Sequence, residues 1–353
     1  MIPATIATAV APETIAKVTR LFNNTAFDVI CELLQNARRA GATGVALALN
    51  GAGAEHFLHI TDDGHGIADP VSIVTLGRSG WSDETRRAED PAGMGVFSLA
   101  GRDVIIRSFS KPDRQGWMAH IPASAWETSR PIAIEPDPIM RGTAITVRVP
   151  DEWLKTLERD VARAAKHYPV PVTWNGAVLP QEDWLKDAVH VEEWYGVRIG
   201  VFQKHPSHYS SRDGRLNFHG LTIPCDLPYV QEVDRGGHWI ARVDIFDAPQ
   251  IQLVLPARKE VVENTGIAAL RDAVRLAIYR AIEAAGTHRL SRGALARYRT
   301  TRSRALSVRM DRLCGRQLAQ LRERRTRDRH RHGADARLRC ADRPTRAGGD
   351  REA

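Results

Sequence analysis

The sequence lacks the features typical of membrane-spanning proteins, of secreted proteins and of proteins with a cysteine-ligated structural metal. None of its apolar runs approaches the roughly 20 residues that a membrane-spanning helix needs. Its first residues, MIPATIATAVAPETIAK, have neither the basic start nor the long apolar stretch of a secretory signal. Its four cysteines stand too far apart in sequence to form a pattern of metal-ligand pairs, at Cys31, Cys225, Cys314 and Cys340. We therefore expect free thiols, no membrane partner and a cytoplasmic location.

Lysine is absent from residues 292–353, where arginine is abundant. This segment holds 19 arginines against seven acidic residues, a local charge of +12, so the other 291 residues carry −4 of the total of +8. Large apolar side chains are scarce in the segment, and we expect a disordered tail. Such a tail can contact nucleic acid through arginine. We favour no selected role, because Arg, Ala, Asp and His mixtures also arise when GC-rich DNA is read in a shifted frame.

At 353 residues the chain is long for one hydrophobic core. Alternating apolar patterns predict helices and short strands, and hence an α/β fold with two domains, 1–150 and 151–291, before the tail at 292–353. Helices are expected at two places within 12–40, the second capped by Thr25, and at 151–167 and 264–285. Strands are expected at 43–49, 56–61, 103–109, 115–121, 143–149, 170–174, 189–202, 215–223, 238–246 and 250–255.

Three short segments carry candidate chemistry. In ELLQN, the spacing of four places the Glu32 carboxylate and the Asn36 amide on one helix face. A carboxylate there can polarise a water, and an amide oxygen is a hard ligand suited to Mg²⁺. Glu and Asn at this spacing also occur on many solvated helices.

The second segment, DDGHGI, directly follows an expected strand. Asp62 at the strand end can accept a hydrogen bond from an adenine amino group. Gly64 and Gly66 let the backbone pass close to a flat ring, where a Cβ would collide. Turns built on Asp-Gly are common without any ligand. Asp63 has an open role in this segment, and His65 is expected to be solvent-exposed.

The third segment, GMGVFS at 93–98, opens an expected helix with two glycines. Successive backbone N–H groups at a helix start bind phosphate oxygens. The segment is not a Walker A loop because no Lys-Ser/Thr pair follows, and it lacks the third glycine of a dinucleotide fingerprint. Each segment is weak by itself, but their order and separation make the combination specific.

Together with LGRSG and GTAITV, these segments resemble the GHKL ATPases, which include gyrase B, the ninety-kilodalton heat-shock chaperone, histidine kinases and MutL. The resemblance covers residues 20–150 clearly and extends more faintly to about 285. The segments LGRSGW and AGMGVFSLAGRDVIIRS, which flank and include the expected ATP lid and its glycines, are most similar to the chaperone branch. It implies a two-layer α/β sandwich, the Bergerat fold, followed by a smaller α/β transducer-like domain. The strand PVTWNG at 171–176 looks like the start of that second domain.

The resemblance also implies roles for single residues in binding ATP and Mg²⁺. Glu32 matches the general base and Asn36 the Mg²⁺ ligand. Asp62 matches the residue that binds the adenine amino group, in a turn with Gly64, Gly66 and Ile67, and Thr143 matches the hydroxyl that helps to hold adenine through water. The phosphate-binding turn corresponds to Gly93, Met94, Gly95, Val96 and Phe97. The mobile ATP lid corresponds to Arg78 and residues 79–92.

The segment LVLPARKEVVEN at 253–264 follows an expected strand and precedes a helix. In the gyrase, MutL and chaperone branches a second domain contributes a basic side chain to the γ-phosphate, and Arg258 or Lys259 is placed in sequence to be that residue. A cation there would stabilise charge during phosphoryl transfer. Both residues could equally be ordinary surface charges.

The resemblance therefore predicts an Mg²⁺-dependent ATPase switch, in which ATP binding closes the lid and brings two subunits together as a homodimer. The sequence does not identify the protein client on which this switch would act. Two alternatives stay open. The chain can be a nucleotide-binding regulatory or scaffold module without significant hydrolysis. It can also be a nucleic-acid-binding protein that acts through the arginine-rich tail.

Overall fold

The computed structural model describes residues 25–52, 55–75, 80–81, 95–128, 130–204, 214–233, 238–254, 259–286, 289–293, 296 and 300. The chain separates into two compact units, residues 1–290 and 291–353, and the elements below belong to the first. Helices and two β-sheets build this unit, which confirms the predicted α/β class. None of the helices in these ranges combines the length and the apolar character that crossing a bilayer requires.

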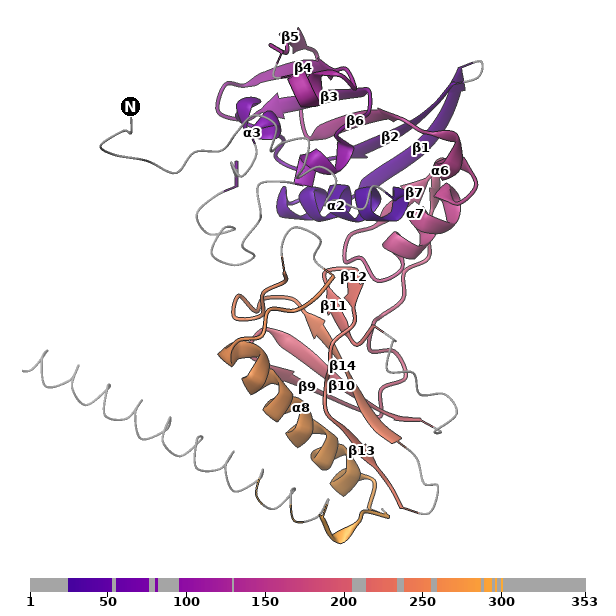
Figure 1. Ribbon diagram of the computed structural model, residues 1–353, viewed down its shortest axis with the longest axis vertical. Helices are drawn as coiled ribbons and strands as arrows, with labels where there is room; N and C mark the ends of the chain where they lie inside the picture. Colours follow the sequence, from indigo (N-terminus) through magenta and orange to yellow (C-terminus); the bar gives the residue numbers. More distant parts are fainter. Residues whose placement is uncertain are drawn as a thin grey trace, which may run out of the picture. The chain divides into compact units, whose positions relative to one another are not determined.

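The first sheet has eight strands in the order β5-β4-β3-β6-β2-β1-β7-β8. Every neighbouring pair is antiparallel except β1 and β7, which run parallel (Figure 1). The strands are β1 (Val45–Ala52), β2 (Glu55–Asp62), β3 (Val104–Ser110), β4 (Gln115–Ile121), β5 (Ile134–Asp137), β6 (Thr143–Arg148), β7 (Val172–Trp174) and β8 (Ala177–Val178).

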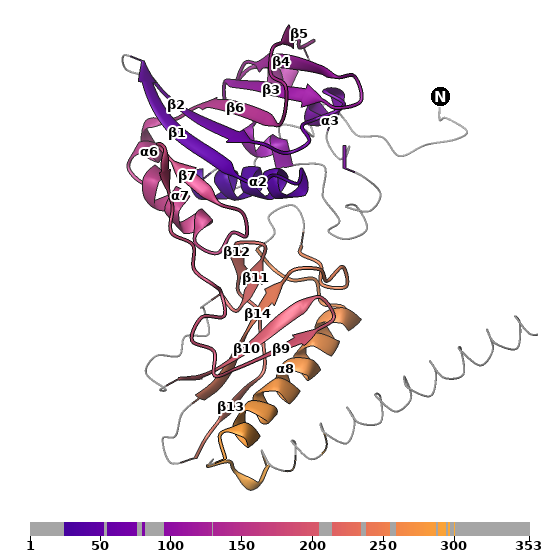
Figure 2. The same cartoon turned by 180° about the vertical axis from the view of Figure 1, so that it is seen from behind.

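Helix α2 (Ala26–Arg39) lies beside α7 (Leu157–Ala165), and both pack against the first sheet (Figures 1 and 2). Thr25 caps α2 as predicted, its side chain accepting a hydrogen bond from the Asp28 amide at 3.2 Å. Apolar side chains at helical spacing form the buried stripe of α2, namely Val29, Ile30, Leu33, Leu34 and Ala37. Short helices complete this part: α3 (Val71–Val74), η1 (Gly95–Leu99), α5 (Ala125–Thr128) and α6 (Asp151–Leu154).

The second sheet has the order β12-β11-β14-β10-β9, with β13 also paired to β14. Helix α8 (Thr265–Ala284) packs on β9, β10, β13 and β14, and Asn264 caps it by accepting a hydrogen bond from the Ile267 amide at 2.9 Å. The strands are β9 (His190–Trp194), β10 (Val197–Lys204), β11 (Leu216–Phe218), β12 (Leu221–Ile223), β13 (Tyr229–Gln231) and β14 (His238–Ile245).

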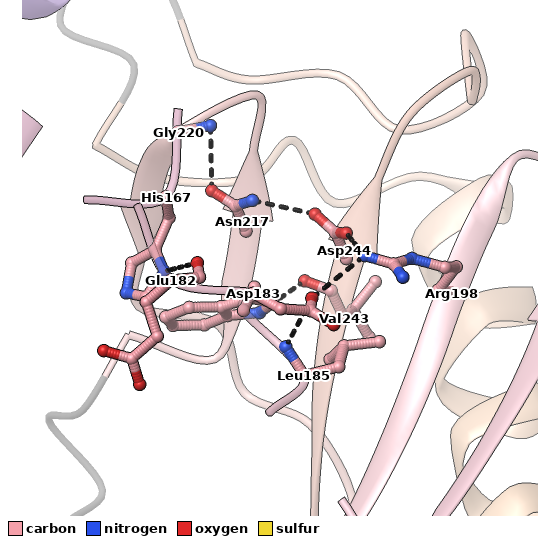
Figure 3. Close-up of polar contacts among 10 residues, drawn as sticks. His167, Glu182, Asp183, Leu185, Arg198, Asn217, Gly220, Val243 and Asp244 are labelled. Carbon is pink, nitrogen blue, oxygen red and sulfur yellow. Dashed lines mark hydrogen bonds and ion pairs between the residues drawn. The ribbon is translucent and has the colours of Figure 1, made fainter. Parts of the chain in front are cut away.

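A chain of polar side chains ties β11, β14 and β10 together, as Figure 3 shows. The buried Asn217 accepts from the Gly220 amide at 2.9 Å and donates to Asp244 at 2.7 Å. Asp244 accepts from Arg198 at 2.6 Å, and Arg198 also reaches Asp183 at 3.1 Å. Each carboxylate of this network accepts a hydrogen bond from a neighbouring donor, which offsets the cost of its burial. Through Asn217 and Gly220, the network also stabilises the β11–β12 turn.

The back of α2 contacts residues that are distant in sequence. Gln35, which is buried, donates to the His219 carbonyl at 2.7 Å, and the Tyr168 hydroxyl donates to the Leu34 carbonyl at 2.6 Å. Burial raises the pKa of the Tyr168 phenol above its ordinary value. These two contacts position the helix that carries Glu32 and Asn36 on its other side.

Most of the predicted helices and strands are confirmed within one to three residues. The interpretation of 171–176 as the start of the second domain is wrong, because β7 extends the first sheet beside β1 and the Val45 amide donates to the Pro171 carbonyl at 3.0 Å. A periodic pattern indicates a strand but does not say which distant strand pairs with it. The division of residues 1–291 into two domains stays a prediction, and the first sheet ends beyond residue 150.

Four further expectations differ from the structure. The segments 189–202 and 215–223, each expected as one strand, are hairpins made of β9 with β10 and of β11 with β12. No strand forms over 250–254, the described part of the strand expected at 250–255, where Leu253 makes only an isolated bridge with Val261. The helix expected at 151–167 is broken into α6 and α7. The helix expected before Thr25 lies outside the described residues, as does almost all of the tail whose disorder was predicted.

Candidate functional site

Seven of the residues that the sequence assigned individually to the ATP and Mg²⁺ site line one pocket. Helix α2, the end of β2 with its following turn, η1 and β6 bring them together: Glu32, Asn36, Asp62, Gly66, Ile67, Val96 and Thr143. Glu32 and Asn36 are half-buried on the same face of α2. Asn36 accepts a hydrogen bond at 3.3 Å from Arg39, which lines the same pocket and was not predicted. The spacing of four in the sequence therefore places two oxygen-bearing groups in one cavity.

Asp62 ends β2 with its carboxylate partly withdrawn from water. Burial raises the pKa of Asp62, while hydrogen bonds from the backbone amides of Gly64 and Thr143 act in the opposite direction. The Gly64 amide donates to Oδ1 at 2.9 Å. Thr143 stands directly opposite Asp62 in the β2–β6 register. The site thus holds a desolvated acceptor next to a hydroxyl, an arrangement that can recognise a polar edge of a flat ring.

The two glycines of the DDGHGI turn are required by the protein's own packing. Gly66 has φ of +74°, and a Cβ there would lie 2.1 Å from the Phe109 carbonyl oxygen. A Cβ on Gly64 would lie 2.7 Å from the carbonyl oxygen and the Cβ of Ala40. The expected reason, room for a ligand ring, is therefore not needed to explain them. Gly66 lines the pocket, whereas Gly64 is not among its lining residues.

Ser108 organises the base of this turn and was missed in the sequence. It is fully buried on β3, and its Oγ accepts from the Ile67 amide at 2.9 Å. The same oxygen lies 2.9 Å from Thr143 Oγ1 and donates to the Gly142 carbonyl at 3.2 Å. The signal available was a polar residue at an inward position of an alternating strand.

Asp63, whose role was open, has a structural place outside the pocket lining. Its carboxylate accepts from the Thr43 amide at 2.6 Å, the Thr43 hydroxyl at 2.5 Å and the Gly44 amide at 3.1 Å. Arg141 forms an ion pair with it at 2.6 Å. These donors lower the pKa of Asp63 to about 2, the Thr43 hydroxyl most of all. Asp63 therefore joins the turn after α2 to the start of β6.

The glycine-rich segment at 93–98 is described only in part. Gly95 begins η1, Val96 lines the pocket, and the Phe97 side chain is buried with its ring 5.8 Å from that of Trp126. A contribution of Phe97 to a ligand would therefore come from its backbone. Gly93, Met94 and Arg78 lie outside the described residues.

Lys259 reaches α2, but Arg258 lies outside the described residues. Lys259 Nζ lies 3.4 Å from Oδ1 of Asp28, one helical turn before Glu32. Lys259 is half-exposed and is not among the residues that line the pocket. The structure thus places this ammonium group against a carboxylate of α2.

The pocket is lined by both apolar and polar side chains. Its walls include Ile60, Ile67 and Ile145, and Asp62 and Thr143 share it with Glu32 and Asn36. This combination suits a ligand with a flat apolar part and a charged part. Within the described ranges, no group of three or more His, Cys, Asp or Glu side chains is placed to hold a metal by itself. A hard oxygen such as that of Asn36 can still bind Mg²⁺ that a phosphate also holds.

No protein-family model and no curated protein match the chain. Among solved structures, it is similar to the ATPase region of topoisomerase II from Saccharomyces cerevisiae. The two are 10% identical, the match covers 74% of this chain and 86% of that chain, and the TM-score is 0.48. A likeness this distant assigns no function.

Proposed function

We propose that the chain binds ATP in this pocket as a GHKL-type protein and hydrolyses it with Mg²⁺. One observation supports the proposal above all others. Residues from ELLQN, DDGHGI, GMGVFS and GTAITV, which are spread over more than 100 positions, line a single pocket. Separate motifs that served only turns and caps would have no reason to meet there.

Adenine occupies the Asp62 end in this proposal. Asp62 accepts the hydrogen bond of the exocyclic amino group, and Thr143 assists on the same side. Gly66 and Ile67 lie beside the ring, in a turn that Ser108 holds. The raised pKa of Asp62 is consistent with this role, because a desolvated carboxylate gains from any donor that a ligand supplies.

The phosphates occupy the α2 end. Glu32 acts as general base and orients the attacking water, and Asn36 holds Mg²⁺ through its amide oxygen. Mg²⁺ neutralises phosphate charge when it is bound. Arg39 lines the same pocket and adds a cation near the phosphates. Lys259 or Arg258 reaches the γ-phosphate from the segment after the second sheet.

ATP binding then closes the lid at residues 79–92 and pairs two subunits, and hydrolysis resets them. A nucleotide-binding module without turnover would use the same pocket, so only a rate measurement separates the two functions. The arginine-rich tail has no described contact that favours a nucleic-acid role.

The test is a titration of the full chain with a fluorescent ATP analogue, with and without Mg²⁺, followed by a turnover assay. We expect saturable binding, loss of turnover by about 100-fold or more with retained affinity in Glu32→Ala, and weaker Mg²⁺-dependent binding in Asn36→Ala. A folded chain that binds no ATP overturns the proposal. Saturable binding without turnover leaves the non-hydrolytic module.

A further inference from the structure

Trp81 is the tryptophan with a surface in the pocket. The chain has eight tryptophans, all within the described residues. Six are core residues no more than 9% exposed, and Trp194 is half-buried on β9. Trp81 is half-buried as well, but it lines the same pocket as Asp62, Gly66 and Thr143. A large aromatic side chain in this position serves neither core, and its location calls for another explanation.

His65 supports Trp81 from the DDGHGI turn. The two rings meet edge to face, with centroids 6.0 Å apart and an interplanar angle of 73°. His65 Nδ1 lies 2.7 Å from the Gly66 carbonyl oxygen, which orients the imidazole ring. This separation is typical of a direct aromatic contact and leaves no room for a third ring between them. The pair therefore forms part of the pocket wall.

The backbone before Trp81 is held against α3. Gly80 also lines the pocket, and a Cβ there would lie 3.0 Å from Ser72 Oγ. Ser72 donates to the Asp69 carbonyl at 2.7 Å. The residue directly before the indole thus lies beside α3, in the segment that follows Asp62.

We propose that Trp81, backed by His65, is a binding residue that packs on the base and ribose of a purine nucleotide. This inference rests on the proposed function and gives a binding contact to one residue of the expected lid, 79–92. His65, which contacts Trp81, lies three residues after Asp62 in the turn that would hold the base. Glu32 and Asn36 line the pocket from α2. An aromatic face gives a sequence-tolerant surface for a base, and removing such a face typically weakens binding by about 5-fold to more than 100-fold.

The experiment compares Trp81→Ala, Trp81→Phe and, as matched control, Trp194→Phe in the full chain. Binding of Mg-ATP, adenosine and Mg-tripolyphosphate is measured by calorimetry, and folding is checked by circular dichroism. We expect Trp81→Ala to weaken ATP and adenosine by the same factor of about ten or more, with tripolyphosphate unchanged. Trp81→Phe keeps an aromatic face and should bind ATP within about threefold of the wild type.

Intrinsic fluorescence provides a second readout that does not depend on affinity. ATP should change the emission of the wild type and of Trp194→Phe, and the change should be lost in Trp81→Phe. If the wild type binds ATP but Trp81→Ala binds adenosine equally well, the inference is wrong and the proposed function stands. A uniform loss for all three ligands also overturns it, since that pattern indicates a general defect. If the folded wild type binds no ATP, the proposed function itself fails.

Discussion

Lys259 and Asp28 form an ion pair, with Nζ 3.4 Å from Oδ1, that joins the segment after the second sheet to the helix bearing Glu32. Asp28 precedes Glu32 by one turn, so the ammonium group is held close to the pocket without lining it. Both side chains are partly exposed, which limits what the pair contributes to stability. The pair therefore shows where Lys259 lies and adds little to stability.

Replacing Lys259 should separate turnover from binding. If the ammonium group serves the γ-phosphate, Lys259→Ala lowers the turnover rate by about tenfold or more and leaves ATP affinity within about threefold. Asp28→Asn removes the ion pair but not the cation, and turnover should stay within about threefold of the wild type. Lys186→Ala, at another exposed lysine, is the matched control. Equal rates for Lys259→Ala and the control would remove Lys259 from the mechanism.

Asp62→Asn should change which nucleotide base the pocket prefers and leave the folded structure largely unchanged. In the wild type, Oδ1 accepts from the Gly64 amide, and an asparagine oxygen would keep that bond and turn its amide nitrogen toward the ligand. A donor then faces the adenine amino group, so we expect ATP affinity to fall by about tenfold or more. Inosine triphosphate, which presents an oxygen at that position, should be affected less. Competition titrations of the two nucleotides give the ratio, and an unchanged ratio contradicts the assignment of Asp62.

The same substitution makes a prediction for stability. Burial raises the pKa of Asp62, so the ionised carboxylate disfavours the folded state relative to the protonated one. At neutral pH, Asp62→Asn should therefore unfold at the same or a higher urea concentration than the wild type. A large loss of stability would mean that Asp62 is a structural residue.

The lowered pKa of Asp63 predicts how the free energy of unfolding changes in acid. Its folded-state pKa of about 2 lies below the ordinary value of 3.8, so its contribution is complete above pH 3.8 and is lost as the pH falls toward 2. Urea unfolding of the wild type should show this loss, and Asp63→Asn should be less stable at neutral pH and lack that part of the slope. Glu193→Gln, at an exposed position of β9, is the control. Parallel curves for wild type and Asp63→Asn would contradict the assigned contacts.

Ser108 and Ser110 offer a matched pair on one face of β3. Each is buried and hydrogen-bonded, so replacement by alanine should cost about 1–3 kcal/mol of unfolding free energy in each case. Ser108 contacts Ile67 and Thr143 of the pocket, whereas Ser110 reaches the pocket only through the Ala68 carbonyl. ATP affinity should therefore fall several-fold in Ser108→Ala and change less in Ser110→Ala. Equal affinities would show that the turn is held without Ser108.

Local chemistry was predictable wherever neighbouring residues decide the structure. Thr25 caps α2 because a side-chain oxygen reaches an amide three residues later, and the apolar stripe of α2 follows from helical periodicity. Asp62 stands at a strand end for the same kind of reason, since alternation stops at the Asp-Gly turn. The positions of Glu32 and Asn36 on one helix face were likewise set by their spacing of four.

The tertiary structure decided everything that depends on pairing between distant residues. Only the β2–β6 register sets Thr143 opposite Asp62, and only long-range contacts place Ser108 beneath the turn and Trp81 against His65. The sheet to which β7 belongs was decided in the same way, by its parallel pairing with β1. The sequence by itself determined the caps, the helical stripe and the motifs, because these are interactions within one or two turns of chain. The pocket required the fold, because its chemistry arises where strands and helices from four separate segments meet.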